Sequence, residues 1–323
     1  MGAALGAAIS LPVLAHAVIR RRARAPEAPR WGRARHFAGR HGAISFQELG
    51  DGPPLVLLHS FGPGYDVSQW QAAAEELAPR HRIYAPDLPG WGRSAGAALE
   101  PALYVEAIAE FIAGVVREPA AVAAAGLPAS YAAHVAARHP EWVQALALVA
   151  PLGITSGPWE GLAGAATDTL SGPLARQVLR ELLRLPLLRV TVLDLLTSRS
   201  ALERHLRHHV YAVPERVDAA VLEHHYRASH LPACRSALAA YLRGDLWLPA
   251  AEVLPRLAAP VWIAWGRCAF HPPVENADLW LRALPGARLE VFERSGDLPH
   301  TEVPAHFGRA LTHFLGELGA RLA

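Results

Sequence analysis

The sequence contains no lysine, and all 31 of its basic residues are arginines. We attribute this absence to the nucleotide composition of the source genome and infer no chemistry from it. The formal net charge is only +2 and is unevenly spread, because residues 20–40 hold eight arginines against the single acidic residue Glu27. The rest of the chain therefore has 23 basic and 28 acidic residues. A mildly acidic main body argues against nucleic-acid binding, which requires a basic face on the folded domain.

Cysteine is scarce as well. Only Cys234 and Cys268 are present, and they do not form a CxxC motif. We expect two free thiols in a reducing compartment, although the sequence alone leaves a disulfide between them open. The apolar fraction of 52% excludes a wholly disordered chain. A chain of 323 residues is long enough for a large core, either as one domain or as a core with an insertion.

Charged residues are absent from residues 1–19, which are followed by an arginine cluster at positions 20–24. This run just reaches the roughly 20 residues that a helix needs to span a bilayer. Alanine and glycine dominate it, however, and Pro12 interrupts it. A membrane anchor, a cleaved signal peptide and a dispensable extension all stay open. An inserted anchor would keep the arginines inside, so we expect a cytoplasmic protein, either free or anchored to the inner face of the membrane.

Strands and helices alternate after an Arg/Pro-rich linker that we place in the N-terminal segment 1–40. Short apolar runs predict strands at 44–48, 55–58, 83–86, 121–124 and 145–149, and again at 261–265 and 288–292. Such alternation is typical of a parallel α/β sheet. Residues 153–255 show only helical patterns. We therefore predict an α/β core formed by residues 41–152 and 256–323, with an inserted helical lid at 153–255.

Four motifs resemble those of the α/β-hydrolase fold. Residues 57–62 (LLHSFG) resemble its apolar strand and H-G-x-G turn, with Ser60 in place of the usual glycine. Residues 87–94 (DLPGWGRS) match its D-x-x-G-x-G-x-S turn, and residues 136–141 (AARHPE) match the end of the helix that follows the nucleophile. Residues 288–300 resemble its last strand and histidine loop. The resemblance covers about residues 42–318 and implies a mostly parallel, doubly wound sheet with an inserted all-helical lid.

The positions to which this resemblance assigns catalysis are all substituted. The nucleophile elbow G-x-S-x-G is replaced by residues 124–128 (AAGLP), which puts Gly126 at the position of the nucleophile. Ala269 stands where the acid of W-G-x-x-D belongs. Asp297 stands where the base of G-H-x-P-H belongs, and only the second histidine, His300, is kept. Because the members of a triad act as a unit, these changes predict that the usual Ser-Asp-His hydrolysis is absent.

The remaining groups support two interpretations. The resemblance implies an oxyanion-like, ligand-binding site formed by the backbone N–H groups of Phe61 and Leu127, with His59 in the same loop. Our main hypothesis is a non-catalytic pseudoenzyme that binds an apolar small molecule. The alternative is an active ester or lactone hydrolase, or a lyase, that uses Asp297 and His300 in a non-standard mechanism. A third class, a structural protein that binds a partner through its lid, also stays open.

Other candidate residues give weaker signals. Ser130 lies a helical turn beyond Gly126, and His271 lies near the empty acid position, but no pattern selects either. His205, His208 and His209 have metal-ligand spacing, yet a solvated helix face explains them without a metal. The apolar run 182–196 fits either lid packing or a ligand-facing or membrane-facing surface. We predict no cofactor and no metal, and the sequence determines neither the ligand nor the oligomeric state.

Overall fold

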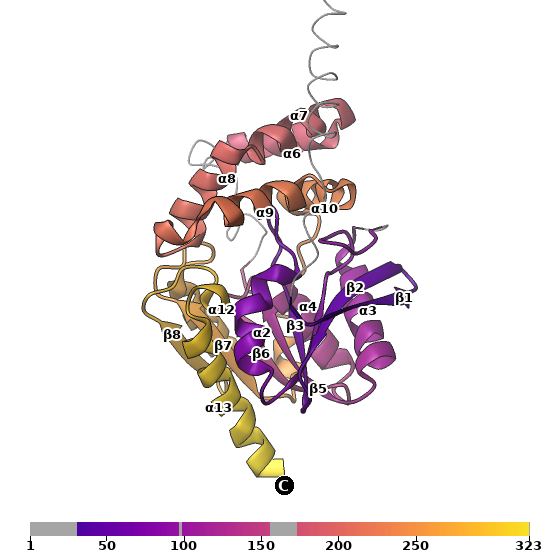
Figure 1. The fold of residues 1–323 in the computed structure, drawn as a ribbon, viewed down its shortest axis with the longest axis vertical. Helices are drawn as coiled ribbons and strands as arrows, with labels where there is room; N and C mark the ends of the chain where they lie inside the picture. Colours follow the sequence, from indigo (N-terminus) through magenta and orange to yellow (C-terminus); the bar gives the residue numbers. More distant parts are fainter. Residues whose placement is uncertain (1–30, 97–98, 156–172, 323) are drawn as a thin grey trace, which may run out of the picture.

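The computed structural model describes residues 31–96, 99–155 and 173–322 (Figure 1). Its sheet has the strand order β1-β2-β4-β3-β5-β6-β7-β8. The strands are β1 (Arg33–Gly39), β2 (Gly42–Leu49), β3 (Pro54–Leu58), β4 (Arg82–Pro86), β5 (Ala120–Ala125), β6 (Val143–Val149), β7 (Val261–Gly266) and β8 (Arg288–Phe292). β2 pairs antiparallel with β1 and β4, and the other neighbouring strands are parallel. The predicted α/β-hydrolase architecture with a mostly parallel sheet is confirmed.

Helices cover both faces of the sheet. The core helices are α2 (Gln71–Leu77), α3 (Pro101–Phe111), α4 (Pro128–Arg138), α11 (Ala277–Ala283), α12 (Pro299–Glu302) and α13 (Pro304–Leu322). Successive residues of β3 point to opposite faces, as the pleat requires. Leu55 and Leu57 pack in one core with residues of α2 and α13, whereas Val56 and Leu58 pack in the other core with residues of α3 and α4. All five residues of β3 are buried, which explains why this strand is continuously apolar.

The segment between β6 and β7 contributes only helices in the part that the structure describes. These are α6 (Pro173–Arg184), α7 (Pro186–Leu196), α8 (Arg199–His205), α9 (Ala219–Ser229) and α10 (Pro232–Arg243), with short turns η4 (Leu206–Val210), η5 (Pro214–Arg216) and η6 (Leu254–Arg256). Helices α6, α7, α8, α9 and α10 form a layer over one end of the sheet (Figure 1). In the apolar run 182–196, Leu185, Leu188 and Leu195 are exposed. Their side chains do not line the pocket described below.

Residues 33–39 correct the predicted linker, because they form the edge strand β1. β1 pairs with β2 through a hairpin that turns at positions 39–42. Its arginines at positions 33 and 35 are exposed, so the strand lacks the apolar run by which the other strands were recognised. Phe37 nevertheless packs edge-on against Phe111 of α3, with 6.2 Å between ring centroids. Charged side chains are a common protection for an edge strand.

Trp31, which precedes β1, supports a prediction about stability. Its side chain is only 3% exposed and belongs to the same core cluster as Leu55 and Trp70. We expect Trp31→Ala to lower the free energy of unfolding by about 3 kcal/mol, because it empties a buried aromatic site. Urea denaturation measures this change, with the exposed Arg33→Ala as control. A loss below about 1 kcal/mol would show that the folded domain does not need Trp31.

Two other expectations concern the chain's compartment. Cys234 is buried and Cys268 exposed, and both are free, which confirms the expected free thiols. No helix among the described residues is long and apolar enough to cross a membrane. Residues 1–19 lie outside the described residues, so the membrane anchor, the cleaved signal peptide and the dispensable extension all stay untested.

Candidate functional site

Gly126 lies at a tight turn between β5 and α4. Its φ is +63°, a left-handed conformation that glycine adopts without steric cost. The Gly126 N–H donates to the carbonyl oxygen of Val149 on β6, and its carbonyl accepts from the N–H of Leu152. The strand-turn-helix geometry expected of a nucleophile elbow is therefore present, with no side chain at its tip.

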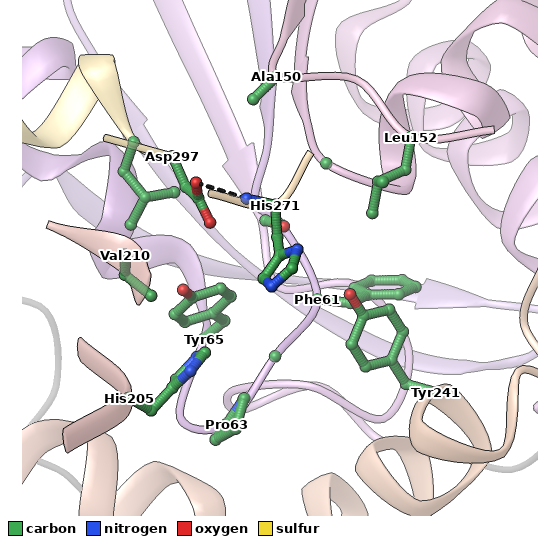
Figure 2. A pocket seen from close by; sticks show the side chains of 14 residues that line it. Phe61, Pro63, Tyr65, Ala150, Leu152, His205, Val210, Tyr241, His271 and Asp297 are labelled. Carbon is green, nitrogen blue, oxygen red and sulfur yellow. Dashed lines mark hydrogen bonds between the residues drawn. The ribbon is translucent and has the colours of Figure 1, made fainter. Parts of the chain in front are cut away.

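A pocket opens above Gly126, between the ends of the core strands and the lid (Figure 2). The cavity itself has a volume of about 40 Å³, and the wider free space around it, which includes open solvent, amounts to about 510 Å³. Core loops contribute Ser60, Phe61, Gly62, Pro63, Tyr65, Gly126, Ala150, Leu152, His271, Asp297 and Leu298, and the lid contributes His205, Val210 and Tyr241. The lining is mixed: six side chains are apolar, and six carry a polar group, namely Ser60, Tyr65, His205, Tyr241, His271 and Asp297. A concave site in which several polar groups converge is a candidate small-molecule site.

Ser60 fills the space that a side chain on Gly126 would occupy. A β-carbon built on Gly126 would overlap the Ser60 hydroxyl oxygen and lie 3.2 Å from the Ser60 Cβ. The Ser60 backbone is fixed, because its N–H donates to Gln69 Oε1 over 2.8 Å and its carbonyl accepts from the His59 ring. The Ser60 hydroxyl makes no hydrogen bond to another described residue. The pocket thus has a serine hydroxyl above the elbow, supplied by a different loop.

His271 and Asp297 reach the pocket from the loops that follow β7 and β8. Asp297 Oδ1 accepts hydrogen bonds from the backbone N–H groups of Phe270, at 2.7 Å, and His271, at 3.0 Å. The His271 ring points into the centre of the pocket (Figure 2). Neither of its ring nitrogens has a hydrogen-bond partner in the described part of the chain. Trp265 Nε1 donates to the Pro272 carbonyl over 3.0 Å, which further fixes the histidine loop.

Burial shifts the pKa values of both groups. It lowers the pKa of His271 to about 4, with a smaller contribution from nearby His209, so the imidazole is neutral at pH 7. Burial raises the pKa of Asp297 well above its usual range, and the N–H groups of His271 and Phe270 only partly oppose this. A neutral imidazole with free nitrogens can accept a proton. Shifted pKa values of two neighbouring groups in one pocket are typical of functional sites.

The predicted oxyanion-like groups lie beside this pocket. Phe61 lines it, and Leu127 follows Gly126 directly at the start of α4. Neither backbone N–H donates a hydrogen bond to another described residue. The Phe61 ring stacks on Trp91 with 4.6 Å between centroids, so its loop is held by the core. Two free amides beside an elbow are the donors that a developing oxyanion requires.

Three of the residues predicted from the sequence, His59, His300 and Ala269, do not line the pocket. His59 is fully buried, its Nδ1 bonded to the Ser60 carbonyl and its Nε2 accepting from the Leu88 N–H. His300 is fully buried and stacks on Trp70 with 4.0 Å between centroids. Burial lowers its pKa to about 3. Ala269 is buried and does not line the pocket. The structure thus brings Asp297 together with Gly126 and Phe61, but not with His300.

Several residues at or beside the site carry no recognisable signal in the sequence. Tyr65 and Tyr241 line the pocket although no motif contains them. Glu302 is fully buried and accepts from the N–H groups of Gly296, at 2.6 Å, and Ala212, at 2.8 Å. It therefore connects the Asp297 loop to the lid. No sequence motif marks Glu302, so only its hydrogen bonds show that it links the Asp297 loop to the lid.

A metal centre is not supported by the described residues, among which no group of three or more His, Cys, Asp or Glu side chains is placed to hold a metal ion. The ring centroid of His209 lies 6.1 Å from that of His205 and 6.4 Å from that of His271.

Comparison with known families places these observations in context. Residues 55–307 match the family model described as "Alpha/beta hydrolase family". This chain belongs to the alpha/beta hydrolase family. The pimeloyl-[acyl-carrier protein] methyl ester esterase of Aeromonas hydrophila is 27% identical over 278 residues, which are 85% of this chain and 100% of that protein. An uncharacterized protein of Mycobacterium tuberculosis is 27% identical over 282 residues, 84% of this chain and 77% of its own length.

Solved structures show the same fold. A serine hydrolase involved in carbazole degradation superposes with a TM-score of 0.70 at 18% identity, covering 88% of this chain and 98% of its own. A bacterial membrane phospholipase A superposes with a TM-score of 0.67 at 23% identity, covering 98% of this chain and 95% of its own. At these identities the superpositions establish the fold, and function has to be argued from the site.

Proposed function

We propose that this protein hydrolyses an ester bond of a small substrate with an apolar acyl group, in the pocket above Gly126. The observation that carries the proposal is the pair of free backbone amides, Phe61 and Leu127, beside a pocket that also holds a serine hydroxyl and a neutral imidazole. Amides placed where charge develops stabilise the transition state of acyl transfer, and losing one such donor typically costs about 10²–10³ in rate. The site therefore keeps the groups that acyl transfer needs most.

The relatives support the same bond type. Several curated relatives are methyl ester esterases that act on an acyl chain attached to a carrier protein. The pocket wall is apolar where an acyl group would lie, with Phe61, Leu152 and Val210 on it. This proposal follows the enzyme alternative of the sequence analysis, but it does not use His300, whose ring packs on Trp70 away from the pocket.

Hydrolysis of p-nitrophenyl esters by the purified protein tests the proposal. We expect turnover above the buffer rate that saturates with substrate. Leu152→Trp should reduce this turnover at least about tenfold, because a larger side chain fills the pocket and overpacks its wall. Leu195→Trp is the matched control, since Leu195 is 67% exposed and lies on the lid away from the pocket. A wild-type rate equal to buffer, or full activity in a folded Leu152→Trp variant, would refute the proposal.

A second candidate function is the non-catalytic binder of an apolar small molecule. The absence of any side chain on Gly126 favours it. This function predicts that octanoate stabilises the wild-type protein against heat but not the Leu152→Trp variant, while no ester is turned over at all. The two functions thus differ in one measured quantity, the rate of ester cleavage.

A further inference from the structure

The side-chain types that are missing from their usual positions are all present in the pocket. The elbow has Gly126 instead of a serine, and Ser60 stands above it. The loop after β8 carries Asp297 instead of a histidine, and the loop after β7 carries His271 two residues beyond Ala269. Ser60, His271 and Asp297 line the same pocket.

We propose that Ser60 is the nucleophile of this site and His271 its general base, so that the catalytic groups have moved to neighbouring loops. This inference rests on the proposed ester hydrolysis and names the residues that perform it. The Ser60 hydroxyl occupies the space where a side chain on the elbow would stand. From this position the Ser60 oxygen would attack the carbonyl carbon of an ester whose carbonyl oxygen is bound between the Phe61 and Leu127 backbone amides.

His271 is the better base of the two candidates. Asp297 Oδ1 already accepts two backbone hydrogen bonds, and its side chain is shorter than an imidazole. The His271 ring has two unpartnered nitrogens and points into the pocket (Figure 2). Asp297 holds the backbone of His271 and is therefore a positioning residue. Its role resembles that of an orienting acid, although it acts on the main chain of the histidine.

The reaction would proceed in two balanced steps. The Ser60 oxygen forms a bond to the carbonyl carbon while His271 takes the hydroxyl proton and the carbonyl electron pair moves to the oxygen, which the Phe61 and Leu127 amides stabilise. The electron pair returns as the ester C–O bond breaks, and His271 gives its proton to the leaving alcohol. Water then attacks the acyl-Ser60, with His271 again accepting and returning the proton, to release the acid and regenerate Ser60.

Labelling with a fluorophosphonate tests the nucleophile directly. We expect one phosphonyl group per wild-type chain, located on Ser60 by peptide mass spectrometry, and none on a Ser60→Ala variant. Ser60→Ala should also reduce ester turnover at least about 10³-fold, as expected for loss of a nucleophile that acts within a unit. Ser130→Ala is the matched control. The Ser130 hydroxyl donates to the Leu248 carbonyl over 2.6 Å and does not line the pocket, so labelling and turnover should persist.

A second pair of variants tests the base. We expect His271→Ala to slow labelling of Ser60 at least about 100-fold. The double variant Ser60→Ala/His271→Ala should turn over esters no more slowly than the slower of the two single variants, because the two residues act as a unit. Equal labelling rates in wild type and His271→Ala would exclude His271 as the base.

The outcomes separate this inference from the proposed function. If the wild type hydrolyses esters while folded Ser60→Ala keeps that rate, the proposed function stands and the inference is wrong. A phosphonyl group found on another residue also overturns the inference. If the wild type neither turns over esters nor reacts with the probe, both are wrong. Should Ser60→Ala fail to fold, the position of the label on the wild-type chain decides.

Discussion

Gly126→Ala is expected to lower the free energy of unfolding by about 2–5 kcal/mol. The residue has a φ of +63°, and a left-handed conformation costs an L-amino acid roughly 1–2 kcal/mol. The added methyl group would also overlap the Ser60 hydroxyl, and overpacking of this kind typically costs about 1–3 kcal/mol. The Ser60 backbone cannot withdraw freely, because it is bonded to Gln69 and His59.

The destabilisation caused by the overlap with the Ser60 hydroxyl should vanish when the Ser60 side chain is removed. In the double variant Ser60→Gly/Gly126→Ala the overlap is absent and only the backbone strain is left. We therefore expect a favourable coupling of about 1–3 kcal/mol between the two positions. Denaturant unfolding of the wild type, both single variants and the double variant measures it. Additive effects within about 0.5 kcal/mol would show that Ser60 does not stand in the space above Gly126.

Asp297→Ala is expected to reduce ester turnover at least about 100-fold. The change removes the Asp297 oxygen that accepts from the N–H groups of Phe270 and His271, so the histidine loop loses the contact that holds it. Displacing a catalytic group by even 1 Å can cost about 10² in rate. Asp297→Asn keeps an acceptor oxygen in the same place and should retain turnover to within about tenfold.

The rescue by asparagine distinguishes a positioning role from a role as base. An amide cannot accept the proton of a nucleophile, so Asp297→Asn would be as inactive as Asp297→Ala if Asp297 were the base. That outcome would favour the mechanism first considered from the sequence, in which Asp297 itself takes the proton. Both rates are to be compared for proteins whose melting temperatures show that they are folded.

The pH dependence of stability gives an independent check on Asp297. Burial raises the pKa of this carboxyl in the folded protein, so the folded state binds the proton more tightly than the unfolded state. The stabilisation is present below the unfolded pKa of about 4 and is lost as the pH rises through the raised value. The wild type should therefore lose stability relative to Asp297→Asn over this range. If the free energy of unfolding depended on pH in the same way in both proteins, the Asp297 carboxyl would have its ordinary pKa in the folded state.

Much of the fold follows from the pattern of apolar residues. Strands such as β3 are buried on both faces, so their sequence is continuously apolar and easily recognised. The apolar pattern does not reveal β1, because its charged residues face solvent and Phe37 is the side chain that packs against α3. An edge strand of this kind has little apolar periodicity, and only its pairing with β2 reveals it.

The site could be located from the sequence, but its chemistry could not. Counting along the motifs puts Gly126 at a tight turn between a strand and a helix, and the structure has such a turn there, because turn geometry is local. The roles proposed for Ser60 and His271 depend on the meeting of loops that are far apart in the chain. For His300 the sequence motif suggests a role that the structure does not support. Its motif suggests a catalytic neighbour for Asp297, yet Trp70 occupies the space beside its ring.

A crystal structure of the fluorophosphonate-treated protein tests the central claim most directly, namely that the pocket above Gly126 performs acyl transfer. We predict electron density for a phosphonyl group joined to Ser60 Oγ, with one phosphonyl oxygen within hydrogen-bond distance of both the Phe61 and Leu127 amides. The alkyl chain should lie along Leu152 and Val210. An empty pocket after complete treatment, or a phosphonyl group bound outside it, would contradict the account.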